Sequence, residues 1–92
     1  MYTITLRKDD RRAIDWIGDR YSHGTDLRRV LEGEAVTAVP EQGWESDLAI
    51  TYHLPEHLAW EVKAIVEEGN LDCINLDSNL AVQLTQLVLA IV

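Results

Sequence analysis

Two five-residue stretches, Tyr2–Leu6 (YTITL) and Ile50–Leu54 (ITYHL), decide the fold. In each of them apolar side chains alternate with threonine or histidine, which is the period of a strand that has one buried face. Each stretch is followed at once by residues with helical periodicity. We therefore predict an α+β fold over residues 1–92: a single small two-layer domain in which an antiparallel strand pair packs against about four helices.

The residues after the first strand predict two helices. Asp9 or Asp10 can cap a helix that reaches about Ser22, and Gly24 stands where a helix often ends in a left-handed conformation. Thr25 then caps a short helix from Asp26 to about Leu31. The side chains expected to face the core are Ala13, Ile14, Ile17, Tyr21, Leu27, Val30 and Leu31, with Trp16 packed beside them.

The second half predicts two further helices. Pro55 suits a first helical turn, and Gly69 ends that helix. Asp77 or Ser78 caps the last helix, which is apolar around most of its circumference and is therefore either central or part of a self-association interface. A short edge strand at Val36–Val39, stopped by Pro40, would complete the sheet. The expected core positions are Leu58, Ala59, Val62, Ile65, Val66, Leu80, Leu84, Leu87, Val88 and Ile91, with Trp60 beside the first group.

The charge of the chain is divided unevenly along its length. Residues 1–30 carry seven basic and five acidic side chains, a net charge of +2, whereas residues 31–92 carry one basic and eleven acidic side chains, a net charge of −10. Such an acidic balance disfavours direct nucleic-acid binding, which usually needs a basic surface. It favours attraction to a partner with a basic surface, or simply keeps a small domain in solution.

The sequence contains no constellation typical of catalysis. His53 and His57 are separated by Pro55 at the change from strand to helix, so they do not form a two-ligand metal motif. Cys73 has no histidine or basic residue near it in the sequence, and a buried thiol is its expected role. The five glycines are scattered and form no phosphate-binding loop. We therefore expect no enzyme, no cofactor and no metal site.

The stretch from Glu41 to Asp47 (EQGWESD) places a tryptophan among carboxylates. A tryptophan in a loop either plugs the core or anchors an interface, and the sequence leaves both alternatives open for Trp44. The longest apolar run, Leu87–Val92, is far shorter than the roughly 20 residues of a membrane span. The candidate partner-binding residues are Glu41, Trp44, Glu45 and Asp47 in this loop, together with Glu67 and Glu68.

Asp15–Gly24 (DWIGDRYSHG) and Leu54–Gly69 (LPEHLAWEVKAIVEEG), taken together, resemble small acidic proteins encoded by bacterial viruses. The resemblance lies in the style of the whole chain, with its strand-helix units and acidic second half. It implies an anti-CRISPR or other anti-defence inhibitor, which acts without catalysis in the host cytoplasm by covering a positively charged nucleic-acid site. The resemblance assigns no individual residue a role.

Three functional hypotheses therefore stand. The first is an inhibitor that binds a basic surface of a larger nucleic-acid-binding complex, without binding nucleic acid or a membrane itself. The second is a nucleotide-binding sponge that uses the basic residues near the first helix. The third is a structural or assembly protein that forms a homodimer through its C-terminal helix. The basic residues of the second hypothesis are Arg7, Lys8, Arg11 and Arg12.

Overall fold

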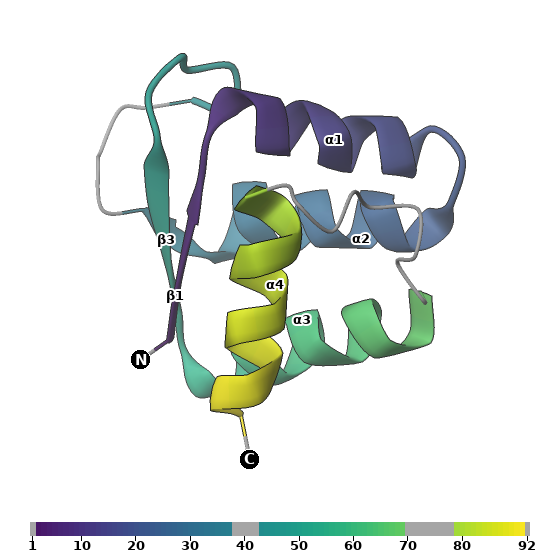
Figure 1. The fold of residues 1–92 in the computed structure, drawn as a ribbon, viewed down its shortest axis with the longest axis vertical. Helices are drawn as coiled ribbons and strands as arrows, with labels where there is room; N and C mark the ends of the chain where they lie inside the picture. The colour runs from purple at the N-terminus through teal and green to yellow at the C-terminus, as the bar shows by residue number, and fades with distance from the viewer. Residues whose placement is uncertain (1, 38–42, 70–78, 92) are drawn as a thin grey trace.

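The two predicted strands are neighbours in one antiparallel sheet. The computed structural model describes residues 2–37, 43–69 and 79–91, and in it β1 (Tyr2–Leu6) pairs along its whole length with β3 (Ile50–Leu54) (Figure 1). A two-residue strand, β2 (Val36–Thr37), pairs with the other edge of β3, so the strand order is β1-β3-β2. The strand pair and the short third strand are thereby confirmed, although residues 38–40 of the predicted edge strand lie outside the described residues.

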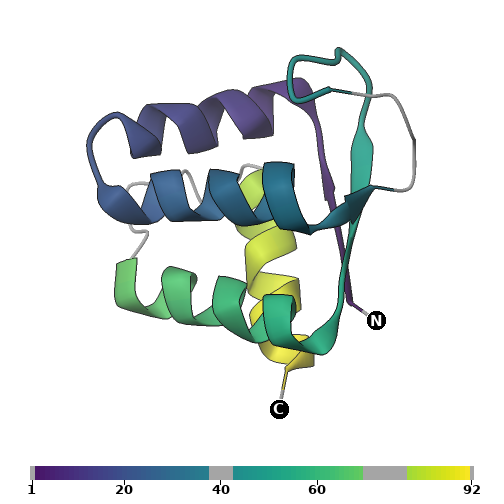
Figure 2. The same cartoon turned by 180° about the vertical axis from the view of Figure 1, so that it is seen from behind.

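The helices form two groups around this sheet. Helices α1 (Lys8–Gly18), α2 (Ser22–Arg29) and α3 (Glu56–Gly69) lie side by side with α2 in the middle, and α4 (Asn79–Ala90) runs across them beside β1 (Figures 1 and 2). A π-helical turn, η1 (Val30–Glu34), continues α2 towards β2. The described residues thus contain the α+β architecture predicted from the strand and helix periods.

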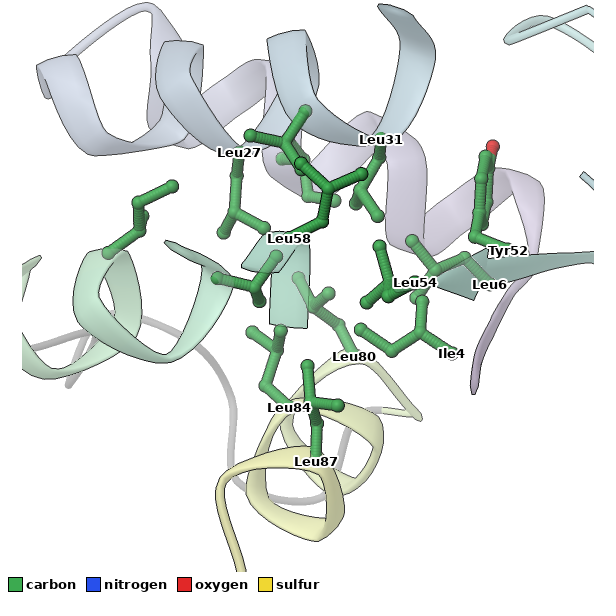
Figure 3. Close-up of a cluster of buried hydrophobic side chains, with 14 of the residues drawn as sticks. Ile4, Leu6, Leu27, Leu31, Tyr52, Leu54, Leu58, Leu80, Leu84 and Leu87 are labelled. Carbon is green, nitrogen blue, oxygen red and sulfur yellow. The ribbon is translucent and has the colours of Figure 1, made fainter. Parts of the chain in front are cut away.

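One apolar core fills the space between the sheet and the helices (Figure 3). The strand residues that alternate as predicted, such as Ile4, Leu6 and Leu54, are fully buried. From the opposite side α4 contributes Leu84 and Leu87, each 3% exposed, whereas Leu89 on its outer face is 73% exposed. The remaining buried side chains come from every helix and include Ile14, Ile17, Leu27, Val30, Leu31, Leu58, Ala59, Val62, Ile65 and Leu80.

The outer edge of β1 is closed by side chains of α4. Gln83 Oε1 accepts the backbone N–H of Thr5 at 3.0 Å, and Asn79 Nδ2 donates to the carbonyl of Thr5 at 3.1 Å. On the sheet face the hydroxyls of Thr5 and Thr51 lie 3.0 Å apart. An edge strand otherwise presents unpaired backbone groups to other chains, so α4 protects this position as well as contributing to the core.

The boundary between the first two helices differs from the sequence prediction. Helix α1 ends at Gly18 and α2 begins at Ser22, so Gly24 is an interior residue of α2 and not a left-handed helix end. A Cβ atom on Gly24 would lie 2.3 Å from the backbone nitrogen of Gly18. Gly24 is therefore needed for the close approach of two helices, and Tyr21, predicted to be inward, lies in the turn at 48% exposure.

The predicted caps were also partly wrong. Arg7 occupies the N-cap position of α1, and the carboxylate of Asp10, three residues later, accepts the backbone N–H of Arg7 at 2.8 Å. This is the reciprocal half of a capping box, in which the third helical residue reaches back to the N-cap. The proposed caps of the last helix, Asp77 and Ser78, lie outside the described residues.

Candidate binding surfaces

The loop that carries Trp44 is fixed to the domain by a buried arginine. Arg11 is 1% exposed, and its guanidinium donates to the carbonyl of Leu6 at 2.8 Å, of Trp44 at 2.7 Å and of Leu48 at 3.2 Å, and also to the carbonyl of Ser46. A buried cation is tolerated when its donors are satisfied in this way. Arg11 therefore has a structural role, and the hypothesis that it meets a phosphate was wrong.

Trp44 plugs the core. Its side chain is 8% exposed and lies beside Tyr52, with ring centroids 6.5 Å apart. The indole Nε1 donates to Asp15 at 3.2 Å, and the guanidinium of Arg28 lies 5.4 Å from the ring centroid. Of the two alternatives left open by the sequence, the structure supports the plug, because so little of the indole is accessible to a partner.

The acidic neighbours of Trp44 do not form a common cluster. Glu45 is exposed, whereas Asp47 accepts a hydrogen bond from Lys8 Nζ at 2.8 Å. This hydrogen bond, followed by the charges of Lys8, Arg12 and Arg11, holds the pKa of Asp47 below its ordinary value. Glu41 lies outside the described residues, so the structure gives no position for its side chain.

Helix α3 presents a different tryptophan to solvent. Trp60 was predicted to pack in the core, but it is 45% exposed. A helical wheel contains the signal, because Trp60 precedes the buried Val62 by two residues, a rotation of about 200° that places the two on opposite sides. Trp16 on α1 repeats the error, since it follows the buried Ile14 by two residues and is 47% exposed.

Carboxylates share the exposed side of α3 with the indole of Trp60. We define the acidic α3 face as Glu56, Trp60, Glu67 and Glu68, all of which are exposed and project from one side of the helix. Lys63 lies at the margin of this face, with Nζ 4.7 Å from the Trp60 ring centroid and 4.0 Å from Glu67 Oε1. Within the described residues, Glu56 and Glu68 have no ion-pair partner.

The predicted partner-binding residues therefore fall on separate parts of the molecule. Glu45 and Asp47 belong to the loop near the start of α1, and Glu67 and Glu68 lie at the far end of α3 (Figure 1). The structure puts the second pair on the same exposed side of α3 as Trp60, which was predicted from the sequence to lie in the core. The acidic α3 face consequently replaces the Trp44 loop as the candidate protein-binding surface.

The carboxylates around α2 are already paired within the protein. Arg28 lies 3.1 Å from Asp15 and 2.9 Å from Glu32, and Arg29 lies 2.9 Å from Glu34 and 3.0 Å from Glu61. The hydrogen bond to Glu32 raises the pKa of Arg28, and the hydrogen bond to Glu61 raises the pKa of Arg29. These partners fix α2 against its neighbours and leave less free charge there than on the outer side of α3.

No group of three or more metal-ligating side chains occurs among the residues that the structure describes. His23 stacks on Tyr21 with ring centroids 5.3 Å apart. Cys73 lies outside the described ranges, so its environment is not defined.

Within the described residues, no helix combines the length and apolar character needed to cross a bilayer.

Comparison with known proteins finds no matching family model, no matching curated protein and no matching solved structure.

Proposed function

We propose that this protein is a non-enzymatic inhibitor that covers a basic surface of a larger nucleic-acid-binding complex. In keeping with the phage-type resemblance, the target is a CRISPR or other defence complex in the host cytoplasm. The observation that supports this proposal is the acidic α3 face, where a half-exposed tryptophan shares one side of a helix with three exposed carboxylates. Residues 31–92, which include this face, carry a net charge of −10.

The two kinds of side chain on this face have different tasks. Free carboxylates create a negative potential that accelerates encounter with a basic surface and weakens as salt rises. An exposed tryptophan supplies a large rigid contact that is desolvated on binding, and tryptophan is enriched among residues that dominate interface energetics. Glu56 and Glu68 are suited to the first task and Trp60 to the second, because all three are accessible in the folded chain.

Glu45 and Asp47, the carboxylates of the loop that carries Trp44, contribute less to this function than the acidic α3 face. Asp47 is held by Lys8, so a partner would have to compete with an existing ion pair. Glu45 is exposed without such a hydrogen bond, although its charge acts on Arg28 of α2. Surface pairs of this kind contribute little to stability, and peripheral charges mainly affect the rate of association. We therefore assign Glu45 and Asp47 to steering and Trp60 to the contact itself.

The direct test is inhibition of purified defence complexes. A panel of CRISPR effector ribonucleoproteins is incubated with the protein, and binding of each effector to its own target DNA is measured. We expect one effector to lose DNA binding at equimolar protein, and the Trp60→Ala variant to inhibit it at least tenfold less well. The matched control is Trp16→Ala, which removes an equally exposed tryptophan from α1. Undiminished DNA binding throughout the panel, or equal losses in both variants, would contradict the proposal.

The third hypothesis retains one specific observation in its favour. Helix α4 contains no charged residue, and its outer side exposes Val82 and Leu89 at 43% and 73%. In a chain with a net charge of −8, a charge-free face is where two copies meet with the least repulsion. Self-association through α4 predicts a dimer by sedimentation equilibrium that becomes a monomer in Leu89→Glu. A monomeric wild-type protein at high concentration would exclude it.

A further inference from the structure

A groove of about 520 Å³ lies where the start of α1 meets the end of the Trp44 loop. Three cations, Arg7, Lys8 and Arg12, line it together with the apolar side chain of Leu48. A volume in this range is typical of sites that hold a small organic molecule. The groove is on α1, so it is separate from the acidic α3 face.

Among the residues that the structure describes, two of the three cations of this groove, Arg7 and Arg12, lack a close carboxylate partner. Arg28 and Arg29 each lie within 3.1 Å of two carboxylates, and Arg11 is saturated by backbone carbonyls. In contrast, no carboxylate in the described ranges pairs with Arg12, and Arg7 only approaches Asp10 at 4.0 Å. Arg7 is also well exposed, at 68% of its side chain. The guanidinium groups of Arg7 and Arg12, whose N–H donors are free within the described part of the chain, therefore both line this groove.

The carboxylates of the groove restrict which anion it can accept. Asp9 and Asp47 also line it, and Asp47 holds Lys8 at 2.8 Å across its wall. Three cations and two carboxylates leave a small positive excess, in a protein whose net charge is −8. A long polyanion would be repelled by the rest of the molecule, whereas a single phosphate group can be held locally by Arg7 and Arg12.

Leu48 provides the second half of a recognition site. Its side chain is 59% exposed, although the flanking loop is fixed by the hydrogen bond from Arg11 to the carbonyl of this same residue. An exposed apolar side chain on a held backbone, beside two guanidinium groups, matches a ligand with an anionic end and an apolar or aromatic body. Arginine favours phosphate in particular, because its planar fork can donate two parallel hydrogen bonds.

We propose that this groove binds a small organic phosphate of the nucleotide class, with Arg7 and Arg12 on the phosphate and Leu48 against the base. Lys8 remains with Asp47 and contributes its charge. This site would give the protein a ligand-sequestering function in addition to protein binding. It does not rest on the proposed role of the acidic α3 face, since the groove shares no residue with that face; only Asp47, assigned above to steering, belongs to both proposals.

The test uses the full-length protein and defined probes. Binding of AMP, ATP, inorganic phosphate and a single-stranded oligonucleotide is measured by calorimetry at low salt. We expect AMP or ATP to bind more tightly than inorganic phosphate, and Arg12→Gln to weaken nucleotide binding about tenfold, as loss of a charged hydrogen bond would. Arg29→Gln is the matched control, because Arg29 is already paired with Glu34 and Glu61 and should leave the affinity unchanged.

A gain of affinity provides a second, independent readout. Asp47→Asn removes a competing negative charge and releases Lys8, so nucleotide should bind several-fold more tightly to this variant. Loss of folding cannot produce such a gain. The proposal is overturned if no nucleotide binds at millimolar concentration, if Arg12→Gln and Arg29→Gln behave alike, or if Asp47→Asn weakens binding. Preferential binding of the oligonucleotide would equally overturn it in favour of a nucleic-acid site.

Discussion

The carboxylate of Asp10 accepts the backbone N–H of Leu80 at 3.0 Å, although 70 positions separate them in the chain. The same carboxylate receives the backbone N–H of Arg7 at 2.8 Å and Asn79 Nδ2 at 2.7 Å. One side chain, 5% exposed, therefore caps the beginnings of both α1 and α4. Because α4 also closes the edge of β1, Asp10 links the first helix to the last one at the sheet.

Replacing Asp10 should consequently destabilise the protein far more than replacing its exposed neighbour Asp9. Asp10→Ala leaves three donors without their acceptor, and each buried unsatisfied donor costs about 1–3 kcal/mol. We expect a loss of about 3 kcal/mol or more in the free energy of unfolding, measured with urea. Asp9→Ala should stay within about 0.5 kcal/mol, as is usual for an exposed site. Similar losses in the two variants would show that Asp10 does not hold the two helices.

Arg11 should stabilise the loop that carries Trp44 in a comparable way. Arg11→Met removes every hydrogen bond to the carbonyls of Leu6, Trp44, Ser46 and Leu48 while keeping much of the apolar stem. We expect unfolding to become easier by about 3 kcal/mol, and amide exchange to accelerate in residues 43–49. Arg12→Met alters the next position, which is exposed, and serves as the control. Unchanged exchange in the loop of Arg11→Met would be incompatible with this role.

Gly24 and Gly33 form a matched pair for testing the contact between α1 and α2. A Cβ atom at Gly24 meets backbone atoms of Ile17 and Gly18 at 2.6 and 2.3 Å, whereas a Cβ atom at Gly33 meets nothing within 4 Å. Gly24→Ala should therefore destabilise the protein by about 1–3 kcal/mol or more, the usual cost of overpacking. Gly33→Ala should be neutral or slightly stabilising in a thermal melt. Equal melting temperatures in the two variants would mean that α1 and α2 can move apart without loss of stability.

Tyr52 should make the protein sensitive to alkaline pH. Burial raises the pKa of its phenol above the ordinary value of 10.0. The folded state therefore keeps the proton more tightly than the unfolded state, so this stabilisation is complete below about pH 10 and is lost as pH rises through the folded pKa. Tyr52→Phe should lose stability less steeply than the wild type above about pH 10 in urea titrations. An equal slope in the wild type and Tyr52→Phe would contradict this origin of the alkaline sensitivity.

The strands β1 and β3 were predictable from the sequence, because the alternation of apolar and polar residues is a local property of each segment. Ile4 and Leu54 share a buried face in both the pattern and the structure. The helix boundary near Gly24 was not predictable in the same way, because its reason is contact with Gly18 on another helix. The capping of α4 by Asp10 is equally non-local, and no periodicity within either segment reveals it.

The acidic α3 face was predictable from the sequence only in part, because its acidic residues and its tryptophan give different local signals. Glu67 and Glu68 were identified from charge, and the structure places them on the same exposed side of α3 as Trp60, two turns further along the helix. Trp60 itself was assigned to the core because large aromatic side chains are usually buried, although its helical phase relative to Val62 argues otherwise. Trp44 shows the opposite case, since a tryptophan in a polar loop is buried here by Arg11 and Asp15, which no local pattern indicates.

The two tryptophans give the last prediction, which separates folding from binding. Trp44→Ala opens a cavity between the loop and Tyr52, so we expect a loss of about 3–5 kcal/mol in unfolding free energy. Trp60→Ala removes a half-exposed ring and should change stability by less than about 1 kcal/mol. Binding to an effector complex should show the reverse order once both variants are compared at a temperature where each is folded: Trp60→Ala dissociates faster, whereas Trp44→Ala binds normally. Stopped-flow dissociation and thermal melts on the same preparations measure both quantities. If instead Trp44→Ala weakens binding while remaining folded and Trp60→Ala does not, the contact surface lies at the loop and the acidic α3 face only keeps the protein soluble.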